Sequence, residues 1–138
     1  MKKLGFISAK RISPGCVEAV YVNGQAAGAQ AAEAFFTADE ACEVVAASES
    51  HSAKETTAPT MTIDIVKEAS GAAAGTSTTS VLESAWVGGD AADTPVRKAG
   101  SGTLASKQLA KGDRLSFKPS ATGTQLTGVI ITVELKYI

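Results

Sequence analysis

His51 is the only histidine in the chain, and two glutamates precede it in a segment with the pattern of a strand. Successive side chains of a strand point to opposite faces, so Glu43, Glu49 and His51 are expected on one face and Cys42 on the other. An imidazole and carboxylates could contribute to a metal site. Zinc sites use several protein ligands, however, and no compact His/Cys cluster accompanies this group. We therefore expect a polar surface or interface role for His51, where it could titrate at acid pH.

Cys16 and Cys42 are the only side chains that could form a cysteine–histidine catalytic pair with His51. Neither cysteine is flanked by an active-site signature, so we do not expect a cysteine protease. The apolar run near the N-terminus covers only residues 4–7, which is too short for the hydrophobic region of a signal peptide. The sequence therefore predicts free thiols in a protein made in a reducing cytoplasm.

Two loop segments resemble ligand sites only superficially. Residues 71–77 are small, but they lack the lysine and the spacing of a phosphate-binding loop. Asp90 and Asp93 follow a glycine pair, but their spacing does not match the calcium loop of an EF-hand. No convergent set of polar residues can be assembled elsewhere. We therefore expect a protein that is not an enzyme, with no catalytic residues, no metal and no cofactor.

The chain has 138 residues, a net charge of -1 and only 5% aromatic residues. This length suits one domain with a core built mainly from Val, Ile, Leu and Ala. There is no block of basic charge that would indicate nucleic-acid binding. No apolar run approaches the roughly 20 residues of a membrane-spanning helix. We expect neither nucleic acid nor a membrane among the partners.

The strongest strand signal lies at residues 129–138. Apolar residues alternate there with Thr132, Glu134 and Lys136. Because a chain terminus would otherwise fray, we expect this strand in the middle of a sheet. The side chains expected to face the core are Val129, Ile131, Val133, Leu135 and Tyr137.

Further short strands are expected along the chain, separated by turn signals. They cover residues 16–22, 41–51, 60–67, 79–87, 103–105 and 114–118. Such a series is typical of a sandwich or jelly roll. The predicted fold class is all-β: a single antiparallel, jelly-roll-like β-sandwich of about seven or eight short strands with an N-terminal arm.

Residues 1–32 are expected to form an N-terminal arm, or a first strand with an alanine-rich segment, and residues 33–138 the β-sandwich domain. Asn23-Gly24 is a hairpin signal, because both residues tolerate positive φ. The alanine-rich window 25–36 fits a helical turn and an extended arm about equally well. The N-terminal segment is also basic, which suits a solvated tail or an arm docked on an acidic partner. Its basic residues are Lys2, Lys3, Lys10 and Arg11.

Trp86 is the only tryptophan. Core packing is the default interpretation, because aromatic side chains bury large apolar areas. The alternative is an exposed anchor in a contact with a sugar or a protein.

Several segments spread over residues 33–138 share their order and spacing with a known family. They are Phe36-Thr37-Ala38-Asp39 with the strand ending Glu49-Ser50-His51, then Met61 to Lys67, Gly75 to Ala85, Gly102-Thr103-Leu104, Leu109 to Leu115, and Leu126 to Lys136. In these segments the chain resembles small structural proteins of tailed bacteriophages, described as capsid decoration, cement or head-fibre proteins. The resemblance carries over no active site.

The resemblance implies a β-sandwich that binds the outer surface of the phage capsid and stabilises the head, often as a trimer. The expected partners are the major capsid protein and further copies of the chain, with a homotrimer favoured, on a virion made in the host cytoplasm. The alternative is a head-fibre or receptor- or carbohydrate-binding module, which would need exposed aromatic side chains. We expect the contacts to come from the N-terminal arm and the loops of residues 68–100. The candidate interface residues are Lys2, Lys3, Lys10, Arg11, Trp86, Tyr137 and Ile138.

Overall fold

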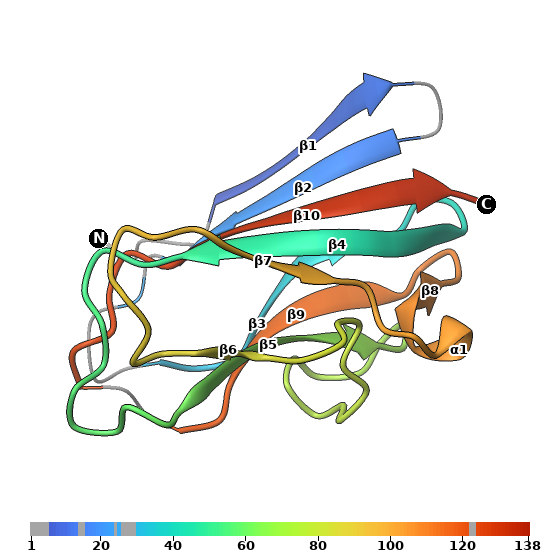
Figure 1. The fold of residues 1–138 in the computed structure, drawn as a ribbon. Coiled ribbons are helices and arrows are strands. Elements are labelled where there is room, and N and C mark those ends of the chain that lie inside the picture. The colour runs from blue at the N-terminus through green and yellow to red at the C-terminus, as the bar shows by residue number, and fades with distance from the viewer. Residues whose placement is uncertain (1–5, 14–15, 24, 26–29, 122–123) are drawn as a thin grey trace.

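Two antiparallel β-sheets face each other across a hydrophobic core in the computed structural model of the chain (Figure 1). The structure describes residues 6–13, 16–23, 25, 30–121 and 124–138. This part of the chain contains ten strands, two of them only two residues long, and one short helix. The predicted all-β antiparallel sandwich is confirmed, with slightly more strands than expected.

The first sheet has six strands, in the order β1 (Phe6–Ser13), β2 (Cys16–Val22), β10 (Ile130–Tyr137), β4 (Cys42–Ser50) and β7 (Val96–Ala99), with β8 (Gln108–Leu109) also paired to β4. The second sheet has four strands, in the order β3 (Glu33–Thr37), β9 (Arg114–Pro119), β5 (Thr62–Glu68) and β6 (Trp86–Val87). A single helical turn, α1 (Leu104–Lys107), lies between β7 and β8. The chain crosses between the sheets at most connections, as sandwiches commonly do.

Strand β10 lies in the middle of the first sheet. It pairs with β2 on one side and with β4 on the other from its first residue onward. Ile131, Val133 and Leu135 point into the core and are almost fully buried, and Val129 joins them just before the strand. The predicted central position and the predicted inward face of this strand are therefore confirmed, with Tyr137 half-buried at the edge of the core.

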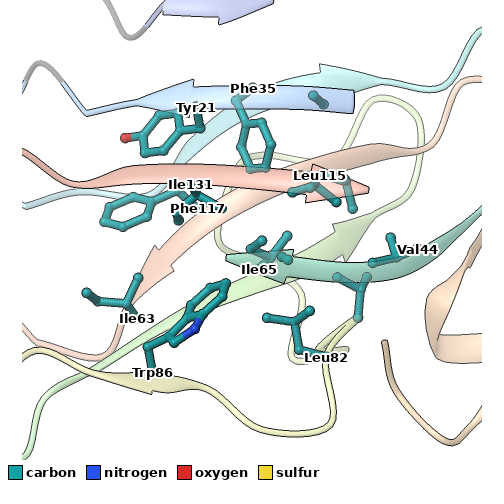
Figure 2. Close-up of a cluster of buried hydrophobic side chains, with 14 of the residues drawn as sticks. Tyr21, Phe35, Val44, Ile63, Ile65, Leu82, Trp86, Leu115, Phe117 and Ile131 are labelled. Carbon is teal, nitrogen blue, oxygen red and sulfur yellow. The ribbon is translucent and has the colours of Figure 1, made fainter. Parts of the chain in front are cut away.

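The core between the sheets is built from a few large side chains and many small ones (Figure 2). Tyr21 of β2 stacks on Phe117 of β9, with ring centroids 5.1 Å apart, and lies 5.2 Å from the ring of Phe35 of β3. Ile63 and Ile65 of β5 are fully buried beneath the first sheet, as their alternation with polar residues predicted. These contacts fasten the second sheet to β2 and β10.

Strand β4 carries an irregularity at Val45. Its register with β10 pairs Val44 with Leu135 and Ala46 with Glu134, so that Val45 is an extra residue on β4. Such a bulge breaks the strict alternation of side chains between the two faces. The residues of β4 that share the inward face of β10 are Cys42, Val44, Ala47 and Glu49.

The bulge corrects the faces predicted for this strand. Glu43 and Ala46 pair with outward-facing residues of β10, whereas Cys42 and Glu49 pair with inward-facing ones. The predicted grouping of Glu43 with Glu49 and His51, opposite Cys42, is therefore wrong. The prediction assumed that side chains alternate strictly along the whole strand, whereas the bulge at Val45 interrupts the alternation.

The N-terminal hairpin signal was also misread. Strand β2 pairs with β1 and β10, and the strand after Asn23 is β3 in the other sheet, so the chain makes a crossover there instead of a hairpin. Within the alanine-rich window, Glu33–Thr37 is a strand, while residues 26–29 lie outside the described residues. Pairing with β9 decides the conformation of this strand against the helix propensity of alanine.

Two weaker strand predictions fare differently. In the window 79–87 only Trp86–Val87 forms a strand, joined by isolated bridges at Ser80 and Leu82. The strand predicted at 103–105 is wrong, because α1 begins at Leu104. The sequence Leu-Ala-Ser-Lys favours a helix over a strand, and Thr103 takes the extended conformation of a helix N-cap.

Neighbouring isoleucines of β10 provide a direct test of this packing. Replacing Ile131, which is fully buried, by alanine is expected to lower the free energy of unfolding by about 3 kcal/mol through lost burial and a cavity. The same change at Ile130, which is 44% exposed, should cost about 1 kcal/mol or less. Chemical denaturation followed by the fluorescence of the buried Trp86 measures both. Equal losses would contradict the assignment of inward and outward faces.

Candidate functional site

The face of the six-stranded sheet that points away from the second sheet carries an uncharged patch. In the strand register, Ile130 lies opposite both Val22 and Ser50. Thr132 lies opposite Val20 of β2 and Ser48 of β4. Ile130 is 44% exposed and the other members are half-buried. None of the described strands, nor α1, packs across these residues (Figure 1). We call this set the outer patch; its members are Val20, Val22, Ser48, Ser50, Ile130 and Thr132.

Charged residues border the outer patch at Arg97, which lies opposite Ser48 in the register, and continue toward the other end of the same face, where they form ion pairs. Arg97 donates to the carboxylate of Glu134 at 3.0 Å. Lys107 of α1 lies 3.0 Å from Glu43, and Lys136 lies 3.6 Å from the same carboxylate. The hydrogen bond from Lys107 is the main cause that lowers the pKa of Glu43. The face therefore offers a flat surface without a strong field of either sign.

The only histidine is buried. His51 is 2% exposed, and its Nδ1 lies 2.9 Å from Oε1 of Glu49, which is also 2% exposed. Its Nε2 lies 3.1 Å from the backbone carbonyl oxygen of Asp90. Burial raises the pKa of Glu49, and the hydrogen bond from His51 opposes that shift. The surface role expected for His51 is therefore wrong, because the side chain ties β4 to the loop after β6.

Glu55 is a second buried carboxylate, and the backbone satisfies it. One oxygen accepts hydrogen bonds from the amides of Thr57 and Ala58 at 2.8 and 3.1 Å, and the other accepts from Gln125 and Leu126 at 2.9 and 3.4 Å. These backbone hydrogen bonds, above all that from Gln125, lower the pKa of Glu55 to about 2. Glu55 thus clamps the loop before β5 to the segment that leads into β10.

The predicted interface residues do not form one site. Trp86 is 1% exposed and donates its indole N–H to the carbonyl of Val96 at 2.8 Å, so it belongs to the core and cannot be an exposed anchor. Tyr137 is half-buried, and its hydroxyl lies 3.5 Å from Oδ1 of Asp39. Ile138 is 60% exposed at the end of the sheet.

The basic residues of the N-terminal segment are described only in part. Lys2 and Lys3 lie outside the described residues. Lys10 and Arg11 belong to β1, where their backbones pair with Glu18 and residue 17 of β2. Both β1 and β2 therefore belong to the six-stranded sheet, and β2 places Ala19 and Tyr21 in the core.

The surface formed by the described residues includes two open hollows. One, of about 360 Å³, lies beside Ile138 and α1, and its Lys67 already donates to the carbonyls of Ala105 and Gln108. The other, of about 180 Å³, lies on the second sheet between Asp64 and Lys118. Neither brings a nucleophile and a base together. Among the described residues, no group of three His, Cys, Asp or Glu side chains could hold a metal ion.

Both cysteines are free thiols within the described structure, as predicted. Cys42 is buried in the core, and burial raises the pKa of its thiol to about 11. Cys16 is half-buried on β2. The geometry therefore gives Cys42 a packing role and makes it a poor nucleophile.

No protein-family model, curated protein or solved structure matches this chain. In the described part, no helix has the length and apolar character needed to cross a membrane.

Sequence reasoning missed the outer patch although its signal was present. The alternation in β10 that predicted the inward residues also defines the outward residues Ile130 and Thr132, and an exposed isoleucine on a central strand was the indication. The pairing of Glu49 with His51 at spacing two was considered. The burial of the two side chains was not predicted, because nothing in the sequence indicates the bulge at Val45 that turns Glu49 inward.

The clamp of Glu55 makes an acid-dependent contribution to stability. A carboxyl group whose pKa is lowered on folding stabilises the fold above its ordinary range, near 4.3, and that contribution is lost as the pH falls toward about 2. Glu55→Gln should therefore be less stable than the wild type at pH 7, and the difference should shrink as the pH approaches 2. Urea denaturation across this range measures it. Glu40→Gln, at an exposed position, serves as the control, and a difference that does not depend on pH would contradict the clamp.

Proposed function

We propose that this chain is a capsid decoration protein of a tailed bacteriophage, which binds the outside of the assembled head through the outer patch. The observation that carries this proposal is the uncharged patch on the broad face of the six-stranded sheet, which no described element covers. The resemblance of residues 33–138 to decoration proteins gives the class of partner, the major capsid protein.

The chemistry of the patch suits adhesion to a protein surface. Val20, Val22 and Ile130 supply apolar area, while the hydroxyls of Ser48, Ser50 and Thr132 can exchange hydrogen bonds with a partner. Small side chains on a flat sheet allow close approach, and the absence of charge from the patch avoids the desolvation of ions. A homotrimer would present three such patches, so that modest single contacts add up through multivalency.

The structure offers less support for a receptor- or carbohydrate-binding module. Such a module depends on exposed aromatic side chains. Tyr21 and Trp86 are each 1% exposed and belong to the core. Tyr137 alone is half-buried at the surface. The groups that could perform chemistry, Glu49 with His51, are likewise enclosed.

The proposal predicts that a charge in the middle of the patch weakens binding to phage heads. In co-sedimentation with purified heads prepared without this gene product, Thr132→Lys should reduce binding at least about tenfold, because burying an unpaired charge costs more than about 1.4 kcal/mol. The lysine stem can reach solvent in the free protein, so the fold should be retained. Circular dichroism checks this.

The matched control is Thr37→Lys, at an exposed threonine of β3 in the second sheet, outside both the outer patch and the loops of residues 68–100. This variant should bind heads like the wild type. Binding of Thr132→Lys at wild-type strength would exclude the outer patch. Failure of the wild type to bind heads, together with binding to host cells, would favour the receptor-binding alternative.

A further inference from the structure

The contacts of His51 fix the number of protons that it shares with Glu49. Its Nε2 lies 3.1 Å from the carbonyl oxygen of Asp90, which can only accept, so Nε2 must carry a proton. Its Nδ1 lies 2.9 Å from Oε1 of Glu49, and two bare lone pairs would repel at that distance. A further proton therefore lies between the two side chains. The pair is either imidazolium with carboxylate or neutral imidazole with carboxylic acid, and its net charge is zero in both cases.

Loss of the shared proton would break the contact with the loop. The remaining ring proton would then sit on Nδ1 and donate to the carboxylate of Glu49, because a buried anion needs a hydrogen-bond donor. Nε2 would be left with a lone pair that faces the carbonyl oxygen of Asp90, and this attraction would become a repulsion. The proton goes to solvent, and nothing else is consumed.

The segment held by this contact is fixed at both ends but weakly between them. Before it, the amides of Gly88 and Gly89 donate to Met61 and Pro59 at 2.8 and 3.1 Å. After it, β7 begins at residue 96. Between these anchors, two contacts join the segment to His51. The carbonyl of Asp90 accepts from the ring Nε2, and the amide of Asp93 donates to the backbone carbonyl of His51 at 2.7 Å.

Asp93 adds a reason for this segment to open. Its φ is 54°, in the left-handed region, where a residue other than glycine is held at some cost in free energy. The hydrogen bond from its amide to His51 helps to hold that conformation. When the ring contact fails, relief of this backbone conformation favours release.

We propose that residues 90–95 are a proton-dependent latch, held against the sandwich while Glu49 and His51 share one proton and released when that proton is lost. The unfolded chain keeps no such proton above the ordinary range of histidine, so the latch contributes stability below roughly pH 6.5 and loses it as the pH rises. The raised pKa of Glu49 implies the same dependence of stability on pH, because a carboxyl group stabilised in its protonated form loses that stabilisation as the pH rises.

The surroundings of the pair supply no strong competing charge among the described residues. From β10 the neighbour of Glu49 is Ile131, and from β7 it is Val96. The loop contributes Asp90, whose charge raises the pKa of Glu49, and Asp93. Lys98 stands two residues further along β7, and Arg97 is engaged with Glu134 on the other face. Glu55, beyond the end of β4, is engaged by backbone amides.

The full-length chain can be tested by NMR between pH 5 and pH 9. Long-range correlations of the imidazole nitrogens should show Nε2 protonated at pH 6. As the pH rises, the opening constant of the Asp93 amide, corrected for intrinsic hydrogen exchange, should increase by up to about tenfold per pH unit, the slope of one linked proton. An unprotonated Nε2 at pH 6, or an opening constant that does not change with pH, would overturn the proposal.

Glu49→Gln separates the latch from simple alkaline destabilisation. The glutamine amide can donate to Nδ1 of a neutral His51, which keeps Nε2 protonated toward Asp90 without any shared proton. The latch of this variant should stay closed across the range, with an opening constant constant within about threefold. Glu43→Gln, on the outward face of the same strand, should titrate like the wild type. A pH slope in Glu49→Gln equal to that of the wild type would refute the latch.

Discussion

The structure depends on the burial of one face of β10 between two neighbouring strands and the opposing sheet. Ile131, Val133 and Leu135 fix which way the strand faces, because a slip by one residue would exchange its apolar and polar rows. The same constraint creates the surface. Once these residues point inward, Ile130 and Thr132 must point outward beside the residues of β2 and β4, and the outer patch follows from the register of the core. The core and the outer patch are therefore two sides of one alternation.

The parts of the fold that could be predicted from sequence are those in which burial on one face imposes a period of two. β10 is the clearest example, and the alternation of Ile63 and Ile65 with polar residues predicted β5 in the same way. Local signals failed where long-range pairing decided the conformation. Asn23 follows a strand that pairs with β1 and β10, so its turn preference does not produce a hairpin. The bulge at Val45 is a backbone irregularity, and through it Glu49 lies on the inward face of the strand while Glu43 lies on the outward face.

Buried carboxylates show three solutions to one electrostatic problem. Glu55 accepts backbone amides and stays ionised at low pH. Glu68, 1% exposed, accepts from Thr76 and Ser77 of the loop after β5. Glu49 is instead hydrogen-bonded to the side chain of His51. Glu55 and Glu68 are satisfied by fixed donors, whereas the contact of Glu49 with His51 requires a shared proton, on which the proposed latch depends. Sequence could not distinguish them, because the donors come from segments far apart along the chain.

The position of the Glu49–His51 pair relates interior electrostatics to the surface. His51 directly follows Ser50, which belongs to the outer patch and lies opposite Ile130. The ring is held between β4 and the loop after β6, at the end of the strand where the patch lies. A change in the loop contact therefore acts on the same end of β4 that presents Ser48 and Ser50. Because β4 is paired with β10 along its length, the backbone of the patch should stay in register while only the flanking loop moves. The proposed binding through the sheet face and the proposed release of the loop are thus physically separable, since the first depends on the core and the second on one proton.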